Sequence, residues 1–142
     1  MRQEEASSKI GKDPGDGGFL RAGFDDFDVF ADTVLSWDLS FMQLESGPFH
    51  ADLFQVMLPS SALLSCSFSR GLVQEGAVPP GCRTIGIPLK GCTPFRWRGH
   101  EVADDVMMIF PRGGELDSRS NSGFRVITLS VRESLLLELA ER

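Results

Sequence analysis

The chain has 142 residues, 42% of them hydrophobic and 24% charged, and a formal net charge of −6 at neutral pH. This size and composition predict one globular domain with a sizeable core, and no apolar run reaches the ~20 residues that a membrane helix needs. Residues 1–40 carry nine acidic against four basic side chains, which argues against a surface that binds nucleic acid directly.

The N-terminal segment 1–22 is rich in glycine, serine and charged residues, so it buries little apolar surface and predicts a disordered tail. It lacks the apolar core of a secretory signal, which favours a cytoplasmic protein. A short helix is expected to begin near Phe24, because Asp25 or Asp26 can cap it. The apolar face of this helix consists of Phe27, Phe30, Ala31 and Val34.

From Trp37 onward, alternating apolar and polar residues predict short strands separated by glycine and proline turns. The segments with this pattern are 37–44, 49–57, 64–70, 83–89, 95–97, 106–110 and 124–131. We expect the first two to pair with each other, and residues 71–81 to form a loop ending in Pro-Pro-Gly. Arg98 and Gly99 predict a hairpin turn, and Pro111 ends a strand. The pattern predicts a mostly-β barrel or sandwich.

The C-terminal segment 132–142 predicts a helix with a broad apolar face. Ser130 and Glu133 have the spacing of a capping box at its start. Its leucines repeat at i, i+4, which suits packing against the same helix of a second chain in a homodimer. The predicted dimer contacts are Leu135, Leu136, Leu139 and Ala140. No glycine or proline stops the helix, so we expect the natural protein to continue past Arg142.

Six short motifs follow one another along most of the chain. They are F-D-D-F-D at 24–28, Q-L-x-x-G-x-F at 43–49, P-P-G-C at 79–82, W-R-G-x-E-V at 97–102, F-P-x-G-G-E-L at 110–116 and G-F-x-V-x-T-L-S-V at 123–131. Their order resembles the effector-binding domain of bacterial AraC-type transcription regulators, particularly the ethanolamine-operon-regulator-like branch. The resemblance implies a cupin-like, jelly-roll type β-barrel over residues 23–131, with a short N-terminal helix and a C-terminal helix.

The same resemblance implies a function. The barrel would hold a small-molecule effector, the terminal helix would begin a dimerising linker, and DNA would be bound only through a C-terminal helix-turn-helix domain that this chain lacks. The sequence therefore predicts the ligand-sensing and dimerisation domain of a transcription regulator.

Residue patterns for catalysis are weak. His50 and His100 are far apart and form no H-x-H pair, so no metal site is predicted. Cys66, Cys82 and Cys92 lack C-x-x-C spacing, which predicts free thiols. The chain also lacks a nucleophile elbow and a phosphate-binding loop. We therefore predict no catalytic residue, no cofactor and no enzymatic activity.

Candidate effector contacts are polar side chains that interrupt apolar stripes, because a buried polar group needs a partner. Gln43, Gln55 and Arg70 interrupt three such stripes, and Phe68 and Trp97 add aromatic surface. Most of these side chains could instead have a purely structural role. The glutamines can bond the backbone at strand ends, Arg70 can emerge into solvent, and Trp97 can pack in the core.

Two other functions stay open at this point. One is a small metal-independent enzyme of cupin type, an isomerase or hydrolase that uses arginine and glutamine side chains. The other is a barrel kept only for dimerisation, with its interior filled by its own side chains. The content of eleven phenylalanines and no tyrosine suits a filled interior, since phenylalanine needs no hydrogen-bond partner.

Overall fold

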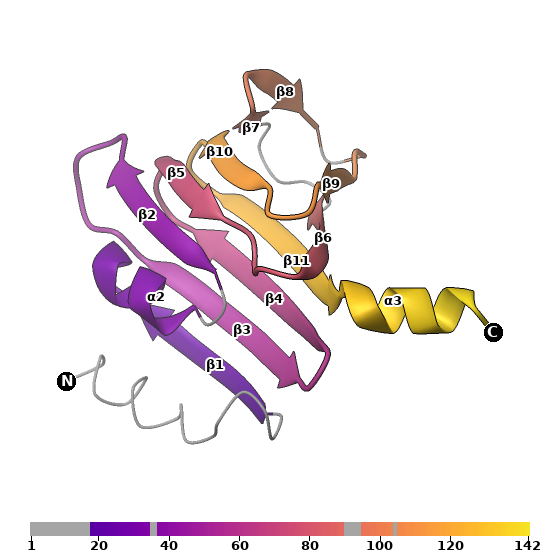
Figure 1. The fold of residues 1–142 in the computed structure, drawn as a ribbon. Coiled ribbons are helices and arrows are strands. Elements are labelled where there is room, and N and C mark those ends of the chain that lie inside the picture. Colours follow the sequence, from indigo (N-terminus) through magenta and orange to yellow (C-terminus); the bar gives the residue numbers. More distant parts are fainter. Residues whose placement is uncertain (1–17, 35–36, 90–94, 104) are drawn as a thin grey trace.

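The computed structural model describes residues 18–34, 37–89, 95–103 and 105–142 (Figure 1). The elements of its first half are β1 (Gly18–Phe24), α2 (Phe27–Thr33), β2 (Asp38–Gln43), β3 (Ala51–Leu58), β4 (Ser61–Phe68), β5 (Leu72–Ala77) and β6 (Cys82–Pro88). Those of its second half are β7 (Phe95–Trp97), β8 (His100–Val102), β9 (Met108–Phe110), β10 (Glu115–Arg119), β11 (Phe124–Arg132) and α3 (Glu133–Ala140).

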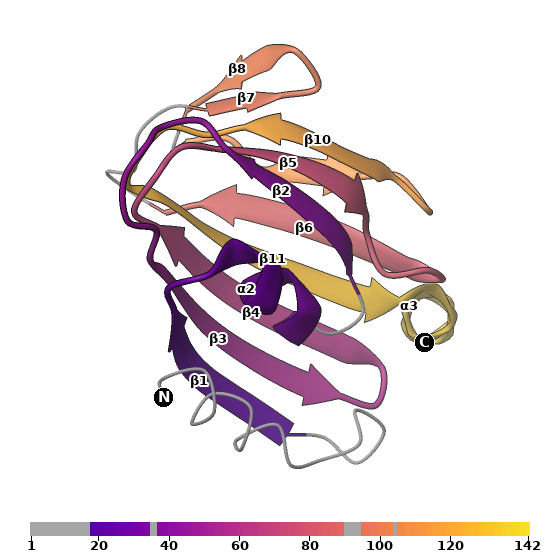
Figure 2. The same cartoon turned by 90° about the vertical axis from the view of Figure 1, so that its left-hand side faces the viewer.

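Two antiparallel sheets face each other (Figure 2). One has the strand order β1-β3-β4-β11-β6-β9 and the other the order β2-β5-β10-β7-β8. Helix α2 packs against β2 and β1, one strand from each sheet. This arrangement confirms the predicted mostly-β sandwich with a short helix near each end of the described chain.

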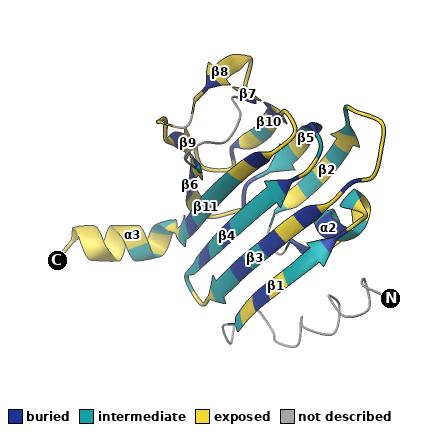
Figure 3. Ribbon diagram, turned by 180° about the vertical axis from the view of Figure 1, so that it is seen from behind, coloured by how far each residue is buried: buried dark blue, intermediate teal, exposed yellow. Residues whose placement is uncertain are grey.

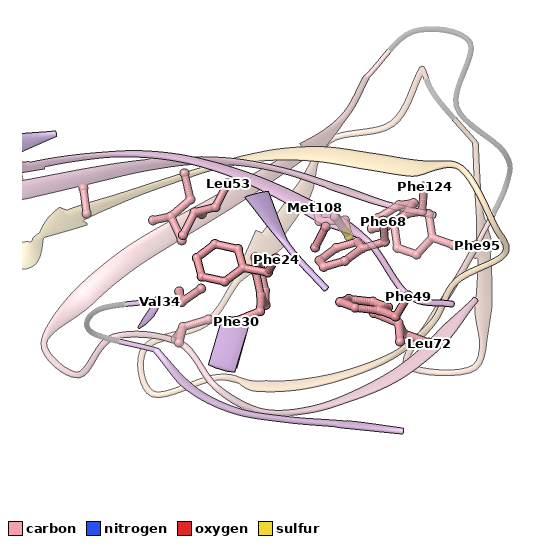
Figure 4. Close-up of a cluster of buried hydrophobic side chains, with 14 of the residues drawn as sticks. Phe24, Phe30, Val34, Phe49, Leu53, Phe68, Leu72, Phe95, Met108 and Phe124 are labelled. Atoms are coloured by element: carbon pink, nitrogen blue, oxygen red, sulfur yellow. The ribbon is translucent and has the colours of Figure 1, made fainter. Parts of the chain in front are cut away.

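An aromatic cluster holds the sheets together (Figure 4). Phe30 of α2 is anchored in it, with ring centroids 5.6 Å from Phe24, 5.5 Å from Phe41 and 5.3 Å from Phe68, all edge-to-face. Such pairs add about 0.5–1.5 kcal/mol each beyond the area that they bury. Helix α2 is therefore fixed by its apolar face, as the sequence predicts.

The N-terminal helix begins where the sequence places it, but the preceding segment differs from the expectation. The Asp26 carboxylate accepts hydrogen bonds from the Asp28 and Val29 backbone N–H groups and caps α2. Residues 18–22, assigned to a disordered tail, belong to β1, which pairs with β3 along its whole length. Leu20 and Phe24 are buried there and Ala22 between them is half-buried, so the strand has an apolar face. Residues 1–17 lie outside the described residues.

The prediction of a loop over residues 71–81 is wrong for residues 72–77 and holds for the Pro-Pro-Gly end at 79–81. Residues 72–77 form β5, a central strand that pairs with β2 on one side and β10 on the other. Consequently β2 does not pair with β3, and the two lie in different sheets. Gly76 has φ +152 and lies so close to β2 that a Cβ would meet the Asp38 carbonyl oxygen at 1.8 Å. The glycine that suggested a loop is thus required for strand pairing.

Short and polar strands also escaped prediction. Strands β8 and β10 were not expected, and the strand predicted at 106–110 is limited to Met108–Phe110. Val106 and Met107 are exposed in the connection before it. The hairpin turn at Arg98 and Gly99 is confirmed, since both residues have positive φ between β7 and β8.

Helix α3 is present, but the predicted capping box is wrong. Ser130 lies inside β11, where its hydroxyl is 2.7 Å from the buried Thr84 hydroxyl, and the N-cap residue is Arg132. None of the α3 residues is buried, and Figure 1 shows the helix projecting beyond the end of β11. Neither helix of the described chain is long and apolar enough to span a membrane.

Candidate functional site

A cavity of about 60 Å³ lies between the two sheets. Aromatic side chains dominate its wall: Phe30, Trp37, Phe41, Phe68, Phe95, Trp97, Phe110 and Phe124. The described lining residues include no charged side chain. The cavity is therefore suited to an uncharged, mostly apolar molecule.

Strand pairing sets a short polar band on the wall formed by the five-stranded sheet. Four residues lie side by side across neighbouring strands of this sheet. In order they are Trp97 of β7, Ser118 of β10, Gln74 of β5 and Phe41 of β2. All four side chains line the cavity. The six-stranded sheet supplies Thr128 of β11 from the opposite wall.

Three polar atoms on residues that line the cavity are buried and have no hydrogen-bond partner among the described residues. They are the indole Nε1 atoms of Trp37 and Trp97 and the hydroxyl Oγ1 of Thr128. Both indoles pack around one ring, with centroids 6.0 Å and 5.1 Å from that of Phe110. An indole N–H only donates, so the residues that line the cavity carry two unused donors and one unused hydroxyl.

The structure brings only part of the predicted ligand set to this cavity. Phe68 and Trp97 line it. The Gln43 amide donates to the Gly47 carbonyl at 2.9 Å, and the Arg70 guanidinium donates to the Pro48 carbonyl at 3.0 Å, so both fix the turn between β2 and β3. The Gln43 contact is the structural role that the sequence left open for it, whereas Arg70 bonds backbone instead of simply emerging into solvent.

Gln55 occupies a different buried position. Its side chain is 2% exposed, and its amide donates to the Thr33 carbonyl at 3.3 Å, at the end of α2. Its Oε1 atom has no partner among the described residues. Gln55 does not appear in the described cavity wall, so its role as an effector contact stays a prediction.

Sequence reasoning missed Thr128, Ser118 and Gln74. Ser118 and Gln74 lie on β10 and β5, the strands that were not predicted, so no inward face was assigned to them. Thr128 interrupts the apolar stripe that Phe124 and Val126 begin. The criterion that selected the glutamines would have found Thr128 if it had been applied to β11.

The cavity wall does not fit a divalent metal. It offers indoles, hydroxyls, an amide and the Cys66 thiol, whose pKa burial raises to about 12, so that the thiolate needed for metal binding is disfavoured. In the described part of the chain, no group of three histidine, cysteine or acidic side chains could hold a metal ion. Cys92 lies outside the described residues.

The two histidines lie outside the cavity. His100 is exposed in β8. His50 is also exposed, and its ring nitrogens lie 3.0 Å from Asp25 Oδ1 and 3.2 Å from Asp52 Oδ1. The hydrogen bond to Asp25 is the main cause that raises the pKa of His50, with a further contribution from Asp52.

The chain is a β-sandwich of two antiparallel sheets, the mostly-β architecture that the sequence predicts. No protein-family model matches it. No curated protein matches it either. Among solved structures, it is similar to the DMSP lyase DddQ from Ruegeria pomeroyi DSS-3, with 18% sequence identity and a TM-score of 0.32. The similarity covers 75% of this chain and 61% of that one, so the chain spans less than two thirds of the lyase's length.

This comparison corrects one prediction. The sequence led us to expect that the chain is not an enzyme, whereas the solved protein with a similar fold is a lyase. The exclusion of catalysis therefore does not stand. At 18% identity and a TM-score of 0.32, the likeness transfers no substrate or catalytic residue to this chain.

Proposed function

We propose that the chain binds a small, neutral, mostly apolar molecule with a hydrogen-bond acceptor in the cavity between its sheets. The observation that carries the proposal is the set of partnerless atoms on residues of a mostly apolar wall: two indole donors and the Thr128 hydroxyl. A buried polar group without a partner costs about 1–3 kcal/mol in proteins. A carbonyl or ether oxygen placed among these atoms would recover part of that cost.

The size and lining of the cavity narrow the ligand class. A volume of about 60 Å³ accommodates roughly two to five non-hydrogen atoms, judged from the space that buried water molecules and benzene occupy in protein cavities. An ion would lose its hydration without gaining an opposite charge from the described wall. Small ketones, aldehydes and ethers therefore fit better than amino acids, amines or sugars.

The finer part of the proposal is an effector role in transcription regulation, which rests on the motif resemblance. The structure supplies a physical route for it. Phe124, Val126 and Thr128 of β11 line the cavity, and the same strand leads directly into α3. A ligand that binds more tightly to one position of β11 would shift the population of α3 positions. A DNA-binding domain beyond α3 would receive that shift.

Acetone and isobutene test the binding site, because the two molecules have nearly the same shape and only acetone carries an acceptor. The chain has two tryptophans, so the indole N–H region of a proton–nitrogen correlation spectrum holds two signals. We expect acetone to shift both signals downfield with a saturable dependence on concentration. Isobutene should shift them less and without the downfield sense of a hydrogen bond.

Two variants and a control complete the experiment. Trp37→Phe and Trp97→Phe assign the signals, and Met42→Gln alters an exposed position outside the cavity wall as a matched control. Indole signals that stay in place up to saturating acetone would refute the proposal and favour a barrel with a filled interior. For the effector role, acetone should change the amide hydrogen exchange of residues 133–140, and unchanged exchange with acetone bound would refute that part alone.

A further inference from the structure

An unbroken row of apolar side chains crosses the outer face of the six-stranded sheet. Strand register aligns one residue from every strand, from the β1 edge to the β9 edge. The row consists of Phe19, Val56, Leu63, Leu129, Ile85 and Ile109. Figure 3 shows this face of the sheet with no described helix or strand lying over it.

The two ends of the row are conspicuously exposed. The side chain of Phe19 is 75% exposed and that of Ile109 is 67% exposed. The residues beside them along each strand, Leu20 and Phe110, are buried in the core, so the outward direction of the row follows from strand alternation. A contiguous apolar row on an open sheet face is typical of an interaction surface.

We propose that a second copy of this chain covers the outer face of the six-stranded sheet, with a two-fold axis running along the row. In this arrangement each strand lies over the same strand of its partner in the opposite direction. Each residue of the row then contacts its own counterpart, and the interface is isologous. Two twisted sheets pack in this way with their strands about 30° apart.

The rows on either side of the axis match under this symmetry on β3, β4 and β11, whereas on β6 the two-fold brings Ile87 over Arg83. On one side the register places Phe54, Ser65 and Ile127 on β3, β4 and β11. On the other side it places Leu58, Ser61 and Val131 on the same strands. The two-fold brings apolar Phe54 over Leu58, polar Ser65 over Ser61, and apolar Ile127 over Val131. This self-complementarity favours a second copy over an unrelated protein.

The charged residues of this face flank the row: Arg21 and Arg83 are two positions from Phe19 and Ile85 along their strands, and two others lie farther out. Asp52 and Arg125 are four positions along their strands from the row residues Val56 and Leu129, and Ser67 stands between them in register. Arg21, closer to the row, lies with its guanidinium carbon 5.3 Å from the ring centre of Phe54. An apolar centre with charged residues at the rim is the anatomy of specific protein interfaces.

The area of the face also suits a dimer. Six strands spaced about 4.8 Å apart, which range from three residues in β9 to nine in β11 and average about seven, span roughly 650 Å² at about 3.3 Å per residue. A standard stable interface buries about 800 Å² per partner, counted over an uneven molecular surface. The whole outer face, rather than the row alone, is therefore the size of one such interface.

Sedimentation velocity between roughly 1 and 100 µM tests the proposal. We expect a dimer of the unmodified chain, and at least a tenfold weaker association for the double variant Phe19→Glu/Ile109→Glu. Both substitutions fall on exposed side chains, so the fold should tolerate them. The matched control Met42→Glu changes a methionine that is 62% exposed on β2 of the other sheet, and it should leave the dimer intact.

A third variant, Leu136→Glu/Leu139→Glu, separates this interface from the helix-mediated dimer that the sequence predicts. A dimer that persists in this variant and dissociates in Phe19→Glu/Ile109→Glu supports the sheet interface. The reverse result overturns it, as does a monomer of the unmodified chain throughout the concentration range.

Cross-linking adds a test that does not depend on how the charged variants fold. Phe19→Cys should form a disulfide-linked dimer under mild oxidation, because the two-fold places this residue beside its counterpart. Met42→Cys should form none above the background of the unmodified chain. Equal cross-linking of the two variants would overturn the proposed axis.

Discussion

Replacing Thr128 with valine should stabilise the protein in the absence of ligand. Its hydroxyl is buried on the cavity wall and has no partner among the described residues. Valine has the same shape and removes the polar atom, so the substitution should recover the desolvation penalty of an unsatisfied hydroxyl. That penalty is about 1–3 kcal/mol. For a chain of this length, each kcal/mol corresponds to about 4 °C in the unfolding midpoint.

Thr84 provides the matched comparison, because it is a buried threonine whose hydroxyl does have a partner. It lies on β6, is 0% exposed, and is 2.7 Å from the hydroxyl of Ser130, which is 1% exposed. Thr84→Val leaves the Ser130 hydroxyl unpaired and should destabilise the protein by about 1–3 kcal/mol. The same chemical change should thus have opposite signs at two positions in one sheet.

Thermal and urea unfolding of both variants without added ligand would measure these effects. Thr128→Ser serves as a further control, since it keeps the hydroxyl and removes only a methyl group. If Thr128→Val loses as much stability as Thr84→Val, the Thr128 hydroxyl is satisfied in solution, and the reasoning that makes the cavity a polar binding site fails.

Three other predictions follow from the structure. Trp97→Phe removes one indole donor and should weaken acetone binding by about 1 kcal/mol, roughly fivefold, and an unchanged affinity in the titration would contradict its role. His50 has a raised pKa in the folded state, so its stabilising contribution is full below about pH 6.5 and is lost as the pH rises through the folded pKa. In His50→Gln, the free energy of unfolding should therefore fall less steeply between pH 5.5 and 8.5, by less than about 1 kcal/mol in total. The same pH dependence of this free energy in both proteins would rule the contribution out. Gly76→Ala should lower the free energy of urea unfolding more than Gly81→Ala does. Both glycines have positive φ, but only at Gly76 would a Cβ clash with the backbone. Equal losses of unfolding free energy in the two variants would contradict this placement of β5.

Alternation along the chain was enough to predict the class of the fold. Strands such as β3 and β11 repeat apolar residues with a period of two, and Asp26 marks the start of α2. Strand β5 was not predicted, because Gly76 and the prolines that follow it are residues typical of a loop. Strand partners could not be derived either, since alternation shows which face of β2 is apolar and not which sheet it joins.

The residues of the binding site were predicted less completely from the sequence than the fold was. Phe68 and Trp97 were selected and line the cavity, whereas Gln43 and Arg70 bond to backbone in a turn. A polar side chain at the end of a strand can reach the backbone carbonyl groups of the adjoining turn. Whether it does so depends on the folded conformation of the turn, which the alternation of apolar and polar residues does not determine. The cavity itself depends on the spacing between two sheets, which the linear pattern does not contain.

The nine residues of strand β11 contribute to both faces of the six-stranded sheet. Its even-numbered positions from Phe124 to Ser130 meet the interior, while Ile127, Leu129 and Val131 meet whatever lies behind the sheet. A slip of one residue would exchange these roles completely, sending Thr128 outward and Leu129 inward. Inserting or deleting one residue here should therefore abolish ligand uptake and self-association in a single step, a linkage that no point substitution on one side would reproduce.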